Sequence, residues 1–507
     1  MIKNIQVTLL YPPEQTWPGT MCKPNGSLAY PMLAGALLEV GIEVKIFDAC
    51  VGNDKDDLNE VFYKSTPLAT GMVRTGTSEE RILEEVRDSD IVGITSIFTH
   101  QETMVLECVK LIKKAYPEKL IISGGVNARN RMRKFFDSGV DIICTSEAEK
   151  TIVDIAQMVS RRQNDWDKIP MISFLSDNKI VRSSATADII WNLDDLPMPA
   201  WHLLPNERYW KIRRPHGGHF HPDEELRYAS MMTSLGCPFA CSYCHIASEK
   251  GKYSDLSGPI GRFRVKSDER VLQELEILKN MGVKQVFIED DSIFGLKRRG
   301  IRLIEKIIGM GLEILDVNGV NIIHMVKKGV PDEEVIELLV KAGFRDITLA
   351  FESANDRIIR QYASRKWDIN KTDVTGLIKT INKYDLRVAG NFMIGYPDET
   401  RQEIEKTVEY AKKRKADGLD AANFFLVMPL PGTPLFDSAV AQGYIPEDFD
   451  PDRMHWQKAN MVNTLVPPQE LEEIRDRAWL ETNNSEYTKY KKEMIIDANT
   501  GEIHKVS

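Results

Sequence analysis

Short, almost continuously apolar runs alternate with helical stretches along this chain of 507 residues, and this alternation restricts its possible folds more than any other feature. In the first third, strands are predicted at 5–11, 43–48, 91–97, 119–123 and 141–145, with helices at 28–40, 79–87, 103–114, 129–136 and 150–161. Apolar strands separated by helices are typical of a parallel sheet that is covered on both faces. We therefore predict an α/β fold that begins with a doubly wound, Rossmann-like domain over residues 1–165.

A second alternation begins near residue 228. Strands are predicted at 229–234, 285–289, 314–320, 346–351, 387–394 and 422–427, with helices at 268–281, 299–310, 332–342, 371–384 and 399–415. These six strand–helix units fall short of the eight that close a barrel, so we predict a partial TIM-type barrel over 228–435. Residues 166–227 are expected to form a linker with a hairpin (171–175 and 179–183), and residues 436–507 a helical C-terminal region.

Composition excludes several classes of function. The formal net charge is −9 and 28% of the residues are charged, which argues against a general nucleic-acid binder. No stretch approaches the roughly 20 apolar residues that span a bilayer, and residues 1–7 resemble a strand more than a signal peptide. Together with cysteines that form no disulfide framework, these features predict a cytoplasmic protein without a membrane span. The stretch His216–His221 and the pair Arg213-Arg214 are expected to be solvated loops.

Three of the seven cysteines, Cys237, Cys241 and Cys244, lie within eight residues, directly after the first strand of the second region. Three thiolates ligate three corners of an iron–sulfur cubane, which leaves the fourth iron open to a chelating amino acid. The alternatives are a zinc site with His245, whose adjacency to Cys244 is poor spacing for one tetrahedron, and buried structural thiols. We favour the cluster. The other cysteines are expected to be packing or loop thiols; they are Cys22, Cys50, Cys108 and Cys144.

The CxxxCxxC spacing, with the aromatic Tyr243 before the last cysteine, resembles the radical S-adenosylmethionine (radical SAM) superfamily. Segments at later strand ends resemble that family in the same order. Residues 287–294, with Glu289, Asp290 and Asp291, resemble the segment that holds the methionyl amino group. Residues 351–353, with Glu352 and Ser353, resemble the segment that contacts the ribose. Residues 393–400, with Gly395, resemble the turn near the adenine. Residues 428–434 resemble the turn after the sixth strand. The resemblance implies a 4Fe-4S cluster on the three cysteines and S-adenosylmethionine as a cofactor.

A doubly wound domain ahead of such a barrel resembles the cobalamin-binding subgroup of this superfamily, and the resemblance covers residues 1–435. The strand ends carry the small residues that a flat corrinoid needs close to the backbone, and with Glu147 they are the candidate cobalamin contacts: Thr95, Ser96, Gly124 and Gly125. The turn Ser146–Glu149 is similar to the Gly-Glu-Gly-Glu turn of the subgroup, with small residues in place of both glycines. An Asp-x-His-x-x-Gly segment is absent, and His100 is expected to be a loop residue, not a cobalt ligand.

The resemblance implies that S-adenosylmethionine is cleaved reductively to a 5′-deoxyadenosyl radical, with electrons from a donor such as flavodoxin or ferredoxin. In this subgroup a methyl group commonly passes from methylcobalamin to an unactivated carbon of a small-molecule substrate. Two alternatives remain open. Relatives of this kind also carry out oxidative cyclisation or rearrangement, and the first domain could instead be a docking domain that binds no corrinoid. The tail aromatics Trp456, Trp479, Tyr487 and Tyr490 are expected to pack a core.

Overall fold

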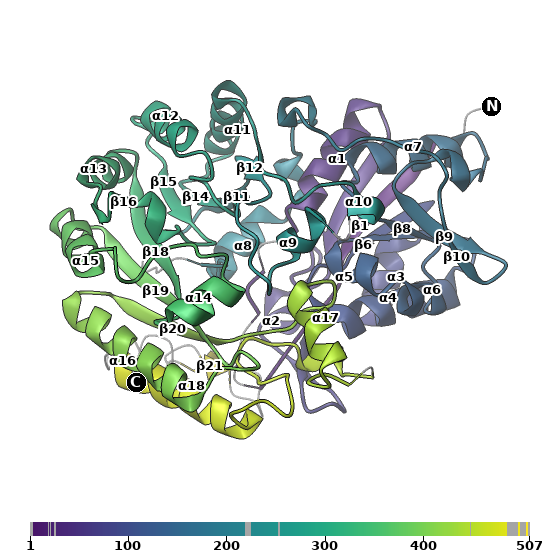
Figure 1. Cartoon of the computed structure of the whole chain (residues 1–507). Helices are drawn as coiled ribbons and strands as arrows, with labels where there is room; N and C mark the ends of the chain where they lie inside the picture. The colour runs from purple at the N-terminus through teal and green to yellow at the C-terminus, as the bar shows by residue number, and fades with distance from the viewer. Residues whose placement is uncertain are drawn as a thin grey trace. The chain divides into compact units, whose positions relative to one another are not determined.

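The computed structural model describes residues 4–18, 20, 22–24, 27–217, 225–251, 254–446, 448–483, 495–496 and 503–504. They form two compact units, each with its own sheet (Figure 1). The first unit contains the described residues up to His216, together with 254–260, 495–496 and 503–504. The second unit contains Gly217, 225–251 and the described residues of 261–483. The finer domain limits drawn from the sequence stay a prediction.

The sheet of the first unit has seven strands in the order β10-β9-β8-β7-β6-β1-β3. The five predicted parallel strands are β1 (Gln6–Tyr11), β3 (Glu43–Asp48), β6 (Ile91–Thr95), β7 (Leu120–Gly124) and β8 (Ile142–Cys144). The predicted hairpin also forms, as β9 (Ile172–Ser176) and β10 (Lys179–Arg182), and it extends this sheet because β9 pairs antiparallel with β8. The strand order reverses beside β1, which is the point where doubly wound sheets bind ligands.

Helices cover both faces of this sheet. They are α1 (Ala29–Glu39), α3 (Glu79–Val86), α4 (Glu102–Ala115), α5 (Val126–Asn130), α6 (Met132–Asp137) and α7 (Glu149–Ser160). Neighbouring residues of β1 belong to different hydrophobic clusters: Leu9 packs with Tyr30 of α1, whereas Leu10 packs with Val105 of α4. Alternation of side chains along a strand explains this division, and burial on both faces explains why the strands are nearly all apolar.

Shorter elements complete the first unit. A small antiparallel sheet contains β2 (Glu14–Thr16), β5 (Val73–Thr75) and β4 (Thr66–Pro67). The short helices are α2 (Leu58–Val61), α8 (Asn206–Ile212) and α10 (Ser254–Ser257), with 3-10 turns η1 (Thr99–Gln101), η2 (Trp166–Lys168), η3 (Leu193–Asp195) and η4 (Trp201–Leu203), and β21 (Ile495–Ile496) pairs with β22 (Ile503–His504).

The second unit contains a six-stranded sheet, and all of its strands are parallel and follow one another in chain order. They are β11 (Tyr228–Met231), β14 (Gln285–Ile288), β15 (Glu313–Asp316), β18 (Phe344–Glu352), β19 (Arg387–Ile394) and β20 (Ala421–Leu426). The helices α11 (Asp268–Asn280), α12 (Lys297–Ile307), α13 (Glu333–Lys341), α15 (Val374–Lys383) and α16 (Arg401–Asp417) lie along one side of this sheet (Figure 1). All carboxyl ends of the strands therefore lie at one edge.

Shorter elements lie in the connections that follow these strands. They are β12 (Ser234–Leu235), β13 (Arg264–Val265), β16 (Val326–Lys327), β17 (Val330–Pro331), α9 (His245–Glu249), α14 (Asp356–Tyr362), α17 (Pro434–Ala441), η5 (Ile322–His324) and η6 (Pro451–Arg453). The predicted C-terminal helix is α18 (Pro468–Thr482), and Asn483 beyond it is hydrogen-bonded to the backbone of Ala422 in β20. Within the described part of the chain, no helix combines the length and the apolar character that crossing a membrane requires.

A stack of phenylalanine rings fixes the register of the last three strands. The Phe351 and Phe392 ring centroids are 4.8 Å apart, and those of Phe392 and Phe424 are 5.5 Å apart. Such ring pairs add stabilisation beyond the area that they bury. The helix that follows β19 begins with a capping box between Thr400 and Glu403, which satisfies two backbone donors reciprocally. Local capping and ring packing thus fix the ends of β18 and β19.

Candidate active site

The three clustered cysteines lie on one loop after β12 in the second unit. Gly236 begins this loop with a φ of +74°, and a Cβ at this position would lie 2.5 Å from the Arg262 carbonyl oxygen. Only glycine allows so close an approach of two backbones. All three cysteines are free thiols; Cys241 is buried and the other two are half-buried. The loop thus presents three unpaired sulfur ligands, the donor set that a site-open iron–sulfur cluster requires.

Neighbouring charges act on these thiols in opposite directions. Burial raises the pKa of the Cys244 thiol to about 12, and the Asp291 carboxylate adds to the rise. The Lys366 ammonium interacts favourably with Cys241 and Cys237 and counteracts the effect of burial on their pKa values. A cation beside the loop stabilises the thiolate form that binds iron.

Glu352 ends β18 in a strained backbone conformation. Its φ is +62°, in the left-handed region that few non-glycine residues adopt, and such strain is often found at functional sites. The Glu352 carboxylate accepts a hydrogen bond from Lys366 Nζ at 2.7 Å, and both side chains are largely buried. The Tyr243 hydroxyl lies near the Glu352 carboxylate and the Cys241 thiol, and burial raises the pKa of this tyrosine. The structure therefore brings together Tyr243, Glu352 and the cysteine loop.

The three acidic residues after β14 have different surroundings. The Asp290 carboxylate accepts hydrogen bonds of 2.6 Å from both the backbone N–H and the hydroxyl of Thr233, and a third from the Ser234 hydroxyl. It thereby fixes the segment that leads into the cysteine loop. The Glu289 carboxylate accepts a hydrogen bond of 3.0 Å from the Ser230 hydroxyl, and burial raises its pKa to about 7. Burial also raises the pKa of Asp291, to about 6. Cofactor contact by these residues stays a prediction.

Ser353 and Gly395 lie at the ends of β18 and β19. The Ser353 hydroxyl is fully buried and accepts a hydrogen bond of 3.1 Å from the Asn355 N–H. Gly395 has a φ of +86°, and its N–H donates to a Glu399 carboxylate oxygen at 2.8 Å. Burial raises the pKa of Glu399 to about 8. These contacts shape the two strand ends, and the predicted contacts with ribose and adenine remain untested.

The candidate cobalamin residues of the first unit follow neighbouring strands. Thr95 ends β6, with Ser96 next to it; Gly124 ends β7, with Gly125 next to it. Gly125 has a φ of +94°, and a Cβ there would lie 2.5 Å from the Ser96 carbonyl oxygen, so this glycine is required by the fold itself. At Gly124 the nearest atom to an added Cβ is the Cys144 Cβ, at 3.7 Å, which is an ordinary van der Waals contact. The half-buried Glu147 follows β8. Small residues at one sheet edge fit a flat ligand.

Several residues near these edges carried no sequence signal. Lys366 was not anticipated, because only the folded chain brings it to Glu352. Asp316 ends β15 with both carboxylate oxygens buried, and this burial raises its pKa to about 8. Cys22 and Cys50, expected to be packing or loop thiols, lie together with Glu14.

Other sequence expectations concern residues away from these edges. The buried thiols of Cys108 and Cys144 lie within the hydrophobic clusters, as predicted. Trp456 packs against Phe425 with ring centroids 5.2 Å apart, as expected for a core aromatic. Tyr487, Tyr490 and residues 218–221 of the histidine-containing stretch lie outside the described residues.

The family comparison finds a match within the second unit. Residues 231–411 match the model of the Radical SAM superfamily. Among curated proteins, an uncharacterized methyltransferase of Pyrococcus horikoshii is 28% identical over 384 residues, which cover 75% of this chain and 74% of that protein. Cytidylyl-2-hydroxyethylphosphonate methyltransferase of Streptomyces wedmorensis is 25% identical and covers 85% of this chain and 80% of that protein. Anaerobic magnesium-protoporphyrin IX monomethyl ester cyclase of Cereibacter sphaeroides is 27% identical, with 78% of this chain and 59% of that protein covered.

Solved structures share the fold of both units. The radical S-adenosylmethionine methyltransferase TsrM from Kitasatospora setae, solved with cobalamin and a [4Fe-4S] cluster, matches with a TM-score of 0.63 at 16% identity, over 87% of this chain and 78% of that chain. The cobalamin-dependent S-adenosylmethionine radical enzyme OxsB matches with a TM-score of 0.66 at 14% identity, over 93% and 66% of the two chains. The resemblance to the radical SAM superfamily is confirmed: residues 231–411 match its model, and the chain shares the fold of cobalamin-dependent radical SAM enzymes.

Proposed function

We propose that this protein is a cobalamin-dependent radical SAM enzyme that methylates an unactivated carbon of a small-molecule substrate. The proposal rests on the loop of Cys237, Cys241 and Cys244. This loop lies beside Lys366, near the start of the region that matches the family model. A 4Fe-4S cluster bound to this loop would supply the electron for reductive cleavage of S-adenosylmethionine. A corrinoid bound to the first unit would supply the methyl group. We further propose that the second unit is a partial barrel, that the protein is cytoplasmic, and that flavodoxin or ferredoxin donates electrons.

The residues of the chain bind and orient in this proposal. The three thiolates hold the cluster, and Lys366 balances part of their negative charge. Among the described residues, the Glu289 carboxylate accepts one hydrogen bond, from the Ser230 hydroxyl, so it is available to a cationic amino group. Glu352 is held in its strained conformation with its carboxylate on Lys366, close to Tyr243 and the cysteine loop, where a ribose hydroxyl can donate to it.

Two findings support methyl transfer and one supports the alternative. The Pyrococcus and Streptomyces relatives are both named methyltransferases, and the second covers 85% of this chain. The sheet edge of the first unit, with small residues such as Gly124 at its strand ends, favours a corrinoid over a domain that serves only for docking. The relative from Cereibacter is named a cyclase, so oxidative cyclisation is the second candidate.

Anaerobic incubation of the reconstituted enzyme with cell extract and S-adenosylmethionine that carries a deuterated methyl group tests the proposal. Mass spectrometry is expected to find a product that has gained the labelled methyl group, and corrinoid absorbance is expected in the protein. Replacing any of Cys237, Cys241 or Cys244 by alanine should abolish cluster absorbance and product, whereas Cys108→Ala should retain both. Full iron and sulfide in a triad variant would disprove the cluster site, and a cyclised, unlabelled product would favour the cyclase.

A further inference from the structure

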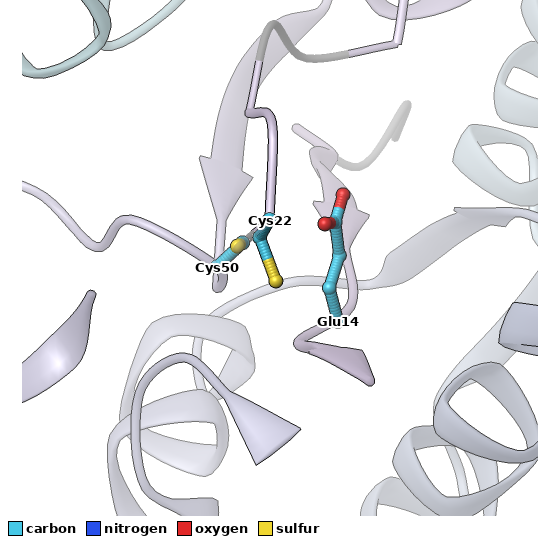
Figure 2. Close-up of side chains that lie close together, drawn as sticks. All are labelled: Glu14, Cys22 and Cys50. Carbon is cyan, nitrogen blue, oxygen red and sulfur yellow. The ribbon is translucent and has the colours of Figure 1, made fainter. Parts of the chain in front are cut away.

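A second cluster of metal-ligating side chains lies in the first unit, apart from the radical SAM cysteines. One ligand atom each from Glu14, Cys22 and Cys50 lies within 4.8 Å of the other two. Figure 2 shows the three side chains gathered from separate segments: Glu14 begins β2, Cys22 lies in the following loop, and Cys50 follows β3. Both thiols are buried, with 3% and 0% of the residue exposed, and the carboxylate is half-buried.

Contacts outside the cluster hold these segments in place. Glu14 faces Thr75 in the register of β2 and β5, and the Thr75 side chain is hydrogen-bonded to the Cys22 thiol. At Gly76 a Cβ would lie 2.7 Å from the Ala49 carbonyl oxygen and 2.8 Å from the Pro13 Cβ. Ala49, Pro13 and Gly76, which are the neighbours of Cys50, Glu14 and Thr75, are therefore closely packed. This packing brings the three donor atoms close together without a bound ion.

The charge of this cluster is unbalanced. Glu14 accepts a hydrogen bond from the Tyr11 hydroxyl at 3.2 Å and interacts with the Cys22 thiol. No lysine or arginine within the described ranges forms an ion pair with it. Cys50 lies beside another carboxylate, because its N–H donates to Asp48 at 2.9 Å. Removing a carboxylate from water without a cation is costly, so a bound cation would stabilise this arrangement.

We propose that Glu14, Cys22 and Cys50 bind one Zn²⁺, with a water molecule in the fourth coordination position. Two thiolates and one carboxylate match the ligands that zinc takes, and three protein ligands with water in the fourth position are typical of catalytic zinc centres. Thiolates disfavour Mg²⁺ and Ca²⁺, which prefer oxygen ligands. On binding, each thiol releases its proton to solvent and forms a sulfur–zinc bond, and no electrons are transferred.

The proposed zinc ligands include none of the candidate cofactor residues. The strand order places β3, which leads to Cys50, on one side of β1, whereas β6, β7 and β8, which lead to the candidate cobalamin residues, lie on the other side. Zinc would join the β1–β2 segment and its loop to the end of β3. The inference therefore does not depend on the proposed methyl transfer, and each can fail without the other.

The test uses the full chain with Cys237, Cys241 and Cys244 all replaced by alanine and without cobalamin, so that cluster iron and corrinoid cobalt do not interfere. Protein isolated from zinc-supplemented cells is expected to retain about one Zn²⁺ per chain by elemental analysis. X-ray absorption at the zinc edge should show two sulfur neighbours at about 2.3 Å and oxygen neighbours at about 2.0 Å. Co²⁺ added to the metal-free protein should produce a sulfur-to-cobalt charge-transfer band in the near ultraviolet.

Further variants separate the site from adventitious binding. Cys22→Ser with Cys50→Ser should lose the zinc, and Glu14→Gln should weaken its retention at least about tenfold. The matched control Cys108→Ser, which changes a buried thiol of the same unit, should retain it. Should the double variant fail to fold, the sulfur shell in the parent protein decides. Absence of zinc, absence of sulfur neighbours, unchanged zinc in a folded double variant, or a Cys22–Cys50 disulfide found by mass spectrometry would each overturn the proposal.

Discussion

The ion pair between Lys366 and Glu352 is expected to be a principal stabilising contact beside the cysteine loop. The Nζ–Oε1 distance is 2.7 Å, and the two side chains are only 14% and 7% exposed. Lys366→Met keeps most of the apolar stem and removes the ammonium group. The Glu352 carboxylate then remains buried without its cation, in a residue whose backbone φ of +62° is already unfavourable.

The degree of burial sets the expected magnitude. Removing one partner of a buried ion pair costs about 3–5 kcal/mol, whereas exposed pairs contribute about 0–1 kcal/mol. Because some of the Lys366 side chain is accessible to water, we expect a loss near the lower limit, about 3 kcal/mol. The double variant Lys366→Met/Glu352→Gln leaves no buried charge, so it should be more stable than Lys366→Met alone by at least about 1 kcal/mol.

Urea unfolding of the cluster-free protein, followed by circular dichroism under reducing conditions, measures these differences. Lys371→Met is the matched control, because its ion pair with Asp368 is long, at 3.5 Å, and its side chain is 83% exposed. The control should change stability by less than about 0.5 kcal/mol. A loss below about 1 kcal/mol for Lys366→Met, or a double variant no more stable than the single one, would refute the assignment of a buried pair.

Further measurements on Lys366→Met and on four other variants have definite expected results. Lys366→Met should lower the reduction potential of the reconstituted cluster in a redox titration followed by electron paramagnetic resonance, because a nearby cation favours the reduced form. Burial raises the pKa of Glu289 from 4.5 to about 7. The contribution of this residue to the free energy of unfolding is therefore complete below pH 4.5 and is lost as the pH rises through 7. Glu289→Gln should make the free energy of unfolding less dependent on pH over that range. Asp290→Asn should cost about 1.5–3 kcal/mol of unfolding free energy and reduce iron retention, because it weakens charge-assisted hydrogen bonds. Gly124→Phe should block cobalamin uptake with normal iron content, whereas Gly125→Ala should destabilise the sheet itself, as measured by thermal unfolding.

Local pattern predicted the regular elements well and their non-local partners poorly. The strands at 43–48 and 387–394 were predicted to the residue, because apolar runs and turn residues define both ends. The predicted helix at 129–136 is instead two helices, α5 and α6, which meet at Arg131. There the Arg131 guanidinium pairs with Glu102 of α4, a contact that no local pattern reveals. The pairing of the predicted hairpin with β8 is non-local for the same reason.

The same limit applies to the candidate sites. The radical SAM cysteines could be found from the sequence because their three ligands lie on one short loop. Cys22 and Cys50 were interpreted as separate thiols, since their segments meet only through the pairing of β2 with β5 and the close packing at Gly76. Lys366 was missed because its charge matters only beside Glu352.

Parallel strands explain why so much of the chemistry could still be located. Their carboxyl ends meet at one edge, so the residues that follow successive strands become neighbours even when they are far apart in the sequence. Where the register of the strands is fixed from within, as by the ring stack of Phe351, Phe392 and Phe424, the positions of Glu352 and Gly395 at that edge are fixed with it. A residue that directly follows a buried parallel strand can therefore be assigned to the functional edge from sequence alone. A residue such as Lys366, which reaches the edge from a loop, requires the folded structure.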